Sequence, residues 1–101
     1  MNRLIIKVKE IRGTCPVFKP GDKIVIDGPE INLKESDAVC IHALSNLSTV
    51  IVALREGIHP YKLGLAPTED SKVAYYRCFD PGPPYTEGGT VLFEVKREQL
   101  K

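Results

Sequence analysis

Long apolar runs are missing from this sequence. The longest apolar-rich stretch, residues 50–54, is far shorter than the roughly 20 residues that a helix needs to cross a bilayer. The amino end reaches Lys7 after a short apolar segment and has no small-residue cleavage site of the kind that ends an export signal. We therefore expect no membrane span and a cytoplasmic location.

A strong excess of charge of one sign is missing as well. The 14 lysines and arginines stand against 13 aspartates and glutamates, so the net charge is +1. Such a balance creates no field that would attract a polyanion. No nucleic-acid partner is expected.

Cysteines are few, and tryptophan is absent. The three cysteines form no C-x-x-C pair, and their odd number favours free thiols in a reducing compartment over a disulfide framework. The glycine-rich phosphate loop, the H-E-x-x-H motif and the G-x-S-x-G motif are also missing. No specific enzyme signature is present, and whether the protein is an enzyme stays open.

What remains is the composition of an ordinary globular protein. The 101 residues are 43% hydrophobic and 27% charged, which suffices for one packed core and leaves no room for a second. We expect a single domain over residues 1–101.

Segments with a period of two predict β-strands. Leu4, Ile6 and Val8 occupy alternate positions, as expected for a strand with one buried face. Pro20 followed by Gly21 has the order of a type II turn and precedes a β-branched run. The four predicted strands cover residues 4–8, 23–27, 73–78 and 91–95.

One stripe of apolar residues has helical spacing. Ser36 and Asp37 are good N-cap residues before it, and Gly57 is suited to end the helix. The β-branched residues 49–52 weaken the second half, so a break near Ser48 is an alternative. The stripe consists of Cys40, Ala43, Leu44, Leu47, Ile51 and Leu54.

The order of these elements predicts the fold class. Two strands, a helical region and two further strands without regular βαβ alternation favour an α+β fold. We expect a mainly antiparallel sheet of about four strands, covered on one face by one long or two short helices. Residues 58–71 and 80–89 are predicted to be loops because they are rich in proline and glycine.

The cysteines and one histidine are the candidate metal ligands. Cys15, Cys40, His42 and Cys78 supply the thiolates and the imidazole that zinc prefers, and iron is a second possibility. Within a helix, however, Cys40 and His42 would project about 200° apart, since a helix has 3.6 residues per turn. Only an extended backbone up to His42 would place both on one side.

Other interpretations of these residues stay open. With Asp37 as N-cap, Cys40 would lie in the first helical turn, where the helix dipole favours a reactive thiolate. A cysteine in an apolar stripe is also commonly a small buried hydrophobe, and His42 is most simply a solvated helical residue. His59 has no evident partner.

Two arginines are further candidates for ligand binding. Arg55 near the helix end and Arg77 beside Cys78 could bind a carboxylate or a phosphate through paired hydrogen bonds. A helix-end contact or a surface ion pair is the alternative for each.

Five short motifs, in this order, resemble those of a family of small uncharacterised prokaryotic proteins. The family pattern is G-x-C-P, G-D, C-x-H-A-L, A-L-R-x-G and C-x-D-P. The resemblance implies that Cys15, Cys40, His42 and Cys78 belong to the family's pattern, which favours a shared site, but it implies no activity. Two residues depart from the pattern: Phe79 stands where the family often has proline after the last cysteine, and Tyr61 stands where it often has tryptophan after the loop proline. The matching segments are Gly13-Thr14-Cys15-Pro16, Gly21-Asp22, Cys40-Ile41-His42-Ala43-Leu44, Ala53-Leu54-Arg55-Glu56-Gly57 and Cys78-Phe79-Asp80-Pro81.

Three functions follow as hypotheses. The leading one is a small cytosolic domain that binds a metal or a small ligand at a Cys/His site. The second is a thiol-based redox protein or enzyme that uses Cys40. The third is a structural interaction module whose cysteines are merely buried.

Overall fold

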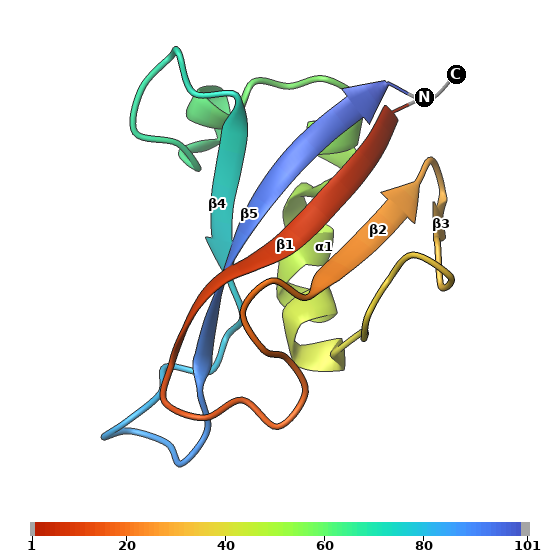
Figure 1. Ribbon diagram of the computed structural model, residues 1–101. Helices are drawn as coiled ribbons and strands as arrows, with labels where there is room; N and C mark the ends of the chain where they lie inside the picture. Colours follow the sequence, from red (N-terminus) through yellow and green to blue (C-terminus); the bar gives the residue numbers. More distant parts are fainter. Residues whose placement is uncertain (1, 100–101) are drawn as a thin grey trace.

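A computed structural model describes residues 2–99 of the chain. A five-stranded antiparallel sheet has the strand order β3-β2-β1-β5-β4, and one long helix lies against it (Figure 1). In chain order the elements are β1 (Asn2–Arg12), β2 (Lys23–Asp27), β3 (Glu30–Ile31), α1 (Ile41–Arg55), the 3-10 helix η1 (Pro60–Leu63), β4 (Val73–Arg77) and β5 (Thr90–Gln99).

This architecture confirms the predicted α+β class with its antiparallel sheet and its helix on one face. The sheet has five strands rather than about four, because β3 is a two-residue strand too short to show a period. The predicted loop after the helix contains η1, where the His59 Nδ1 atom accepts a hydrogen bond from the Tyr61 N–H. Among residues 2–99, no helix has the length and apolar character needed to cross a membrane.

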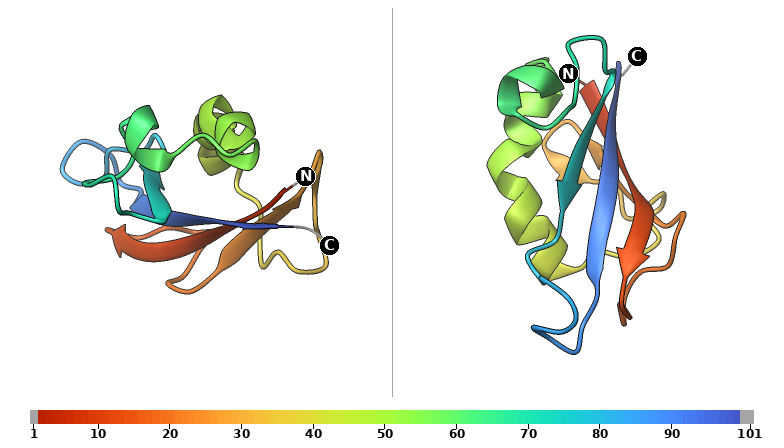
Figure 2. Two further views of the ribbon diagram at one scale, coloured as in Figure 1. Left: turned by 90° about the horizontal axis from the view of Figure 1, so that it is seen from above. Right: turned by 90° about the vertical axis from the view of Figure 1, so that its left-hand side faces the viewer.

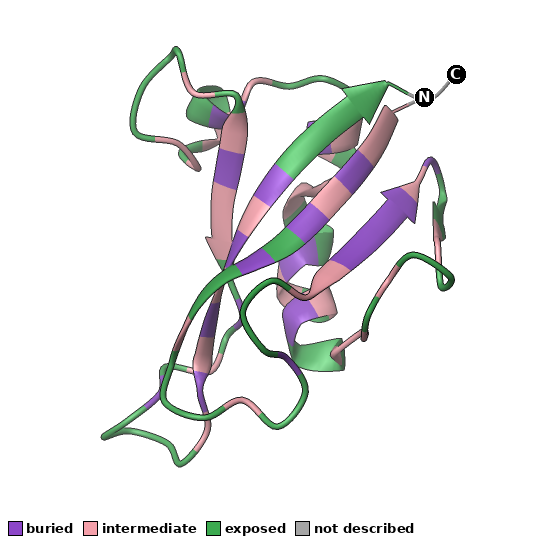
Figure 3. Cartoon of the chain, in the orientation of Figure 1, coloured by how far each residue is buried: buried purple, intermediate pink, exposed green. Residues whose placement is uncertain are grey.

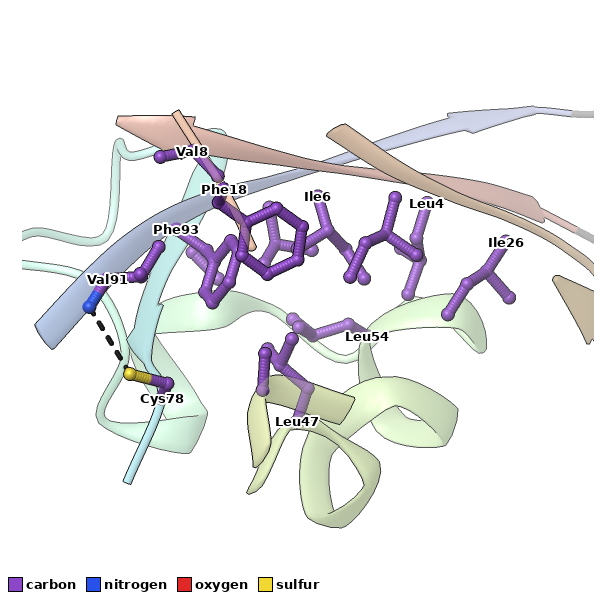
Figure 4. Close-up of a cluster of buried hydrophobic side chains, with 14 residues drawn as sticks. Leu4, Ile6, Val8, Phe18, Ile26, Leu47, Leu54, Cys78, Val91 and Phe93 are labelled. Carbon is purple, nitrogen blue, oxygen red and sulfur yellow. Dashed lines mark hydrogen bonds between the residues drawn. The ribbon is translucent and has the colours of Figure 1, made fainter. Parts of the chain in front are cut away.

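The core lies between the sheet and α1 (Figure 2). Alternate residues of the central strand β1 are fully buried, as the purple bands of Figure 3 show. Leu4, Ile6 and Val8 point to this layer with Phe93 of β5, and the Phe18 ring meets the Phe93 ring edge to face (Figure 4). The strand period therefore builds the core as predicted.

The helix contributes a narrower apolar stripe than its sequence predicts. Ala43, Leu47 and Leu54 are buried, and Ile51 packs partly against the core. Leu44 is only half-buried and lies outside the core cluster.

The start of the helix corrects the sequence prediction. Ser36 and Asp37 do not cap it: the Ser36 hydroxyl accepts from the Val25 N–H, and the Asp37 carboxylate accepts from the Lys23 N–H. Both side chains thus satisfy backbone groups of β2, and α1 begins only at Ile41 with Cys40 as N-cap. The same side-chain chemistry that suits a cap also suits an unpaired strand N–H, so the sequence alone did not distinguish the two.

The helix ends as predicted and does not break in the middle. Gly57 has a φ of +99°, and the N–H groups of Gly57 and Ile58 return to the carbonyls of Leu54 and Ala53. The helix continues through Ser48, which gives one long helix.

Candidate functional site

Three segments meet at the end of the molecule where α1 begins (Figure 1). They are residues 13–18 after β1, residues 39–43 at the start of α1, and residues 78–91, which run from the end of β4 into the start of β5. The first and third segments touch through their backbones: a Cβ on Gly89 would lie 2.8 Å from the Thr14 carbonyl carbon. Glycine at position 89 therefore allows the two loops to close on each other.

A pocket of about 380 Å³ lies at this junction. Among the described residues, no Asp, Glu, Lys or Arg lines it. Within the described part of the chain, the lining side chains with a heteroatom are three thiols and one imidazole, those of the four residues that the sequence singled out. The lining residues are Cys15, Pro16, Val17, Phe18, Val39, Cys40, Ile41, His42, Ala43, Cys78 and Val91.

Cys78 is the most buried of the three cysteines that line the pocket. It directly follows β4 and is only 5% exposed. The Sγ atom accepts a hydrogen bond from the Val91 N–H at 3.3 Å (Figure 4). It also donates one to the Gly89 carbonyl oxygen at 3.7 Å. Both sulfur contacts tie β4 to the start of β5, so Cys78 has a structural role in the pocket wall.

Cys15 and Cys40 are both half-buried and differ in their hydrogen bonding. The Cys15 Sγ atom accepts a hydrogen bond from the Phe18 N–H at 3.3 Å within its loop. Cys40 has extended backbone angles, φ −91° and ψ 129°, and its side chain makes no capping hydrogen bond. It therefore stands just before the helix, not within the first helical turn as the sequence predicted.

His42 lies at the edge of the pocket, on the second residue of α1. Its ring packs against the Phe79 ring, with 4.7 Å between the centroids and a tilt of 35°. The next residue, Asp80, accepts hydrogen bonds from the Gly82 N–H and the Thr86 hydroxyl. These two donors and, to a smaller extent, the charge of His42 hold the pKa of Asp80 below its ordinary value.

Neither Phe79 nor Asp80 is among the residues predicted from the sequence. The signal that could have found them is the equal spacing of the motifs C-x-H at residues 40–42 and C-x-D at residues 78–80. The fold brings these two motifs together, one from the start of α1 and one from the end of β4.

The four predicted metal ligands share a pocket without forming a ligand cluster. Over residues 2–99, no three His, Cys, Asp or Glu side chains are grouped so that they could hold a metal ion. Tetrahedral zinc needs sulfur ligands at about 2.3 Å and nitrogen ligands at about 2.0 Å. The zinc or iron hypothesis thus has its residues in one place but lacks a coordination geometry.

The two arginines lie outside this pocket. Arg55 donates a hydrogen bond to the Gly28 carbonyl oxygen at 3.1 Å, which ties the end of α1 to the turn after β2. It also forms an ion pair with Glu56. Arg77 is exposed and borders a separate depression of about 150 Å³ that Arg12 also lines. The fold does not bring either guanidinium to the cysteines.

Comparison with known proteins adds no assignment. No protein-family model matches the chain, and no curated protein or solved structure matches it either. The motif resemblance therefore stays a prediction, and the pocket itself is the basis for a function.

Proposed function

We propose that this protein binds a small molecule with an apolar body in the pocket lined by Cys15, Cys40, His42 and Cys78. One observation carries the proposal: three segments distant in the sequence converge on a pocket whose lining, over residues 2–99, contains no carboxylate, ammonium or guanidinium group. We place this activity in the cytoplasm, where the three unpaired thiols would stay reduced.

The size and chemistry of the pocket support this ligand class. Its volume of about 380 Å³ falls in the range of roughly 300–1,000 Å³ that is typical of small-molecule sites. Val39, Ala43 and Val91 supply apolar wall, and burial of apolar ligand surface stabilises a complex by about 25 cal/mol per Å² before entropic costs. Thiols are polarisable and form only weak hydrogen bonds, so they tolerate an apolar neighbour.

Ethylbenzene is a suitable first probe, titrated into ¹⁵N-labelled protein by NMR. We expect saturable shifts of amides around the pocket. The variant Val39→Trp should fill the pocket and abolish them, whereas Val52→Trp, at a helix position that is 55% exposed, should leave them unchanged. Absence of saturable shifts in the natural protein, or identical shifts in Val39→Trp, would contradict the proposal.

Metal content provides an independent check. Protein purified without chelator should contain no stoichiometric zinc or iron. One equivalent of either metal, lost on replacing Cys40 and Cys78 by serine, would replace the proposal with metal binding at the same four residues.

Thiol chemistry at Cys40 is the second candidate, and one observation favours it. Within residues 2–99, the sulfur atoms of Cys15 and Cys78 both accept a backbone hydrogen bond, and that of Cys40 accepts none. Cys40 also precedes the N-terminus of α1, where the helix dipole stabilises a thiolate. Timed labelling with N-ethylmaleimide and mass spectrometry should find Cys40 modified first and Cys78 last; equal rates for the three thiols would exclude a specially reactive Cys40.

A further inference from the structure

Among the described residues of the pocket lining, His42 is the one whose side chain carries strong hydrogen-bonding atoms. The other lining side chains are apolar or end in a thiol. In small-molecule sites, a few placed polar groups orient a ligand that is otherwise held by apolar contact. The imidazole therefore decides what polar group the ligand can carry, if its ring is held in place.

Phe79 holds one face of this ring. The two rings lie 4.7 Å apart between centroids, although Phe79 is 53% exposed to solvent. Contact between aromatic faces restricts the side-chain torsions of both residues. An exposed phenylalanine in this position is explained by its contact with His42.

The segment that carries Phe79 is itself firmly anchored at Asp80. The Asp80 carboxylate accepts from Gly82 and Thr86, and its backbone carbonyl accepts from the Thr90 hydroxyl at 2.6 Å. Gly88 packs so closely on the carboxylate that a Cβ there would collide with it. The position of Phe79 over His42 is thus set by a network of hydrogen bonds that closes the loop.

From this arrangement we infer that Phe79 and Asp80 are positioning residues for His42, and that the ligand carries one neutral hydrogen-bonding group, such as a hydroxyl, on its apolar body. The inference rests on the proposed function. A neutral imidazole offers one donor and one acceptor, and a hydroxyl can pair with either.

Charge near the imidazole argues against an anionic group on the ligand. Asp80 directly follows Phe79, whose ring packs on the imidazole, and the Asp80 carboxylate and His42 are close enough to interact electrostatically. Beside a neutral imidazole, a ligand carboxylate would meet the like charge of Asp80, and among the described residues the pocket lining contains no Lys or Arg to offset this repulsion. A neutral head group avoids that cost.

Three probes with a similar body test the inference: ethylbenzene, 2-phenylethanol and phenylacetate. The measured quantity is the affinity of 2-phenylethanol divided by that of ethylbenzene. We expect this ratio to fall by about two- to tenfold in His42→Ala and in Phe79→Leu, the range for one net hydrogen bond. Phe79→Tyr keeps the aromatic contact and should preserve the ratio. Tyr85→Leu is the matched control, because Tyr85 is an 81% exposed aromatic residue of the same loop.

Two further readouts separate positioning from general loop stability. The ring protons of His42 should show a ring-current shift that Phe79→Leu removes and Tyr85→Leu retains. Phenylacetate should bind more weakly than 2-phenylethanol, and Asp80→Asn should narrow this gap, since the amide oxygen can still accept from Gly82 and Thr86 without the charge.

The outcomes distinguish the two proposals. If neither ethylbenzene nor 2-phenylethanol binds the natural protein, the proposed function fails, and the ring-current shift still tests the Phe79 contact. If both probes bind and the ratio is the same in His42→Ala, the pocket stands and the role of His42 is overturned. An unchanged His42 spectrum in Phe79→Leu overturns the positioning role of Phe79.

Discussion

Individual side chains determine how the loop between β4 and β5 is held at the pocket. Asp80 is the clearest case, because its carboxylate and its carbonyl oxygen accept hydrogen bonds from three residues of that loop and of β5. The Thr86 hydroxyl is the largest cause of the lowered pKa of Asp80, followed by the Gly82 N–H. These hydrogen bonds therefore stabilise the ionised carboxylate of Asp80 in the folded protein relative to the unfolded chain.

This lowered pKa predicts an acid-dependent contribution to stability. The contribution is complete above the unfolded pKa of about 3.8 and is lost as the pH falls through the lower folded pKa. The free-energy difference of unfolding between the natural protein and Asp80→Asn should therefore shrink as the pH is lowered from 6 to 2, measured by urea denaturation. Glu87→Gln, an exposed residue of the same loop, should give a curve parallel to that of the natural protein. A difference that grows toward acid pH would contradict this account.

At the scale of elements, the helix is held chiefly by its buried stripe. The first turn contains no acidic residue, and the N-cap side chain makes no hydrogen bond, so the usual end contributions are weak. At the other end, Arg97 donates to the Leu54 carbonyl oxygen and Asn2 donates to that of Arg55. Packing of Ala43, Leu47 and Leu54 must therefore supply most of the attachment to the sheet.

Leu47 is the position at which this attachment can be measured. Its side chain is fully buried, so Leu47→Ala should lower the free energy of unfolding by about 2–5 kcal/mol through lost apolar contact and a cavity. Val52→Ala, on the exposed side of the same helix, should change it by less than about 0.5 kcal/mol. Chemical denaturation of both variants gives the comparison. Equal small losses would mean that this face of α1 does not pack on the sheet.

The elements also show where local sequence reasoning stops. Alternation at residues 4–8 and helical spacing after residue 40 predict the strand and the helix, because each depends on neighbours a few residues away. The misplaced helix start has a tertiary cause. The side chains of Ser36 and Asp37 accept hydrogen bonds from backbone N–H groups of β2. No sequence pattern around residue 36 indicates that β2 lies beside it.

At the scale of the whole molecule, the pocket depends on close contact between two loops, which the missing side chain of Gly89 allows. Gly89 is buried, and a Cβ there would lie 2.8 Å from the Thr14 carbonyl carbon and 2.9 Å from the Cys15 nitrogen. Both neighbours are backbone atoms, so one loop must move to accept any side chain.

Gly89→Ala should therefore open the pocket wall at Cys15. We expect a loss of about 1–3 kcal/mol in the free energy of unfolding, as for other insertions into packed sites. Maleimide labelling of Cys15 should also become faster, while labelling of Cys40 changes less. Glu87→Ala, exposed in the same loop, serves as the control. Unchanged stability together with unchanged Cys15 labelling would show that the two loops are not in contact.

The sequence by itself determined the α+β class, the order of two strands, a helical region and two further strands, and the candidate site residues, because periodicity and turn chemistry are local properties. Only the tertiary structure decided that Cys15, Cys40, His42 and Cys78 line one pocket and that Arg55 and Arg77 do not. The contact of Phe79 with His42, and the position of Asp80 next to Phe79, also depend on the tertiary structure. Which loops meet is set by strand pairing across the sheet, as where β5 joins both β1 and β4, and by backbone approach at Gly89, and these relations link residues more than ten positions apart.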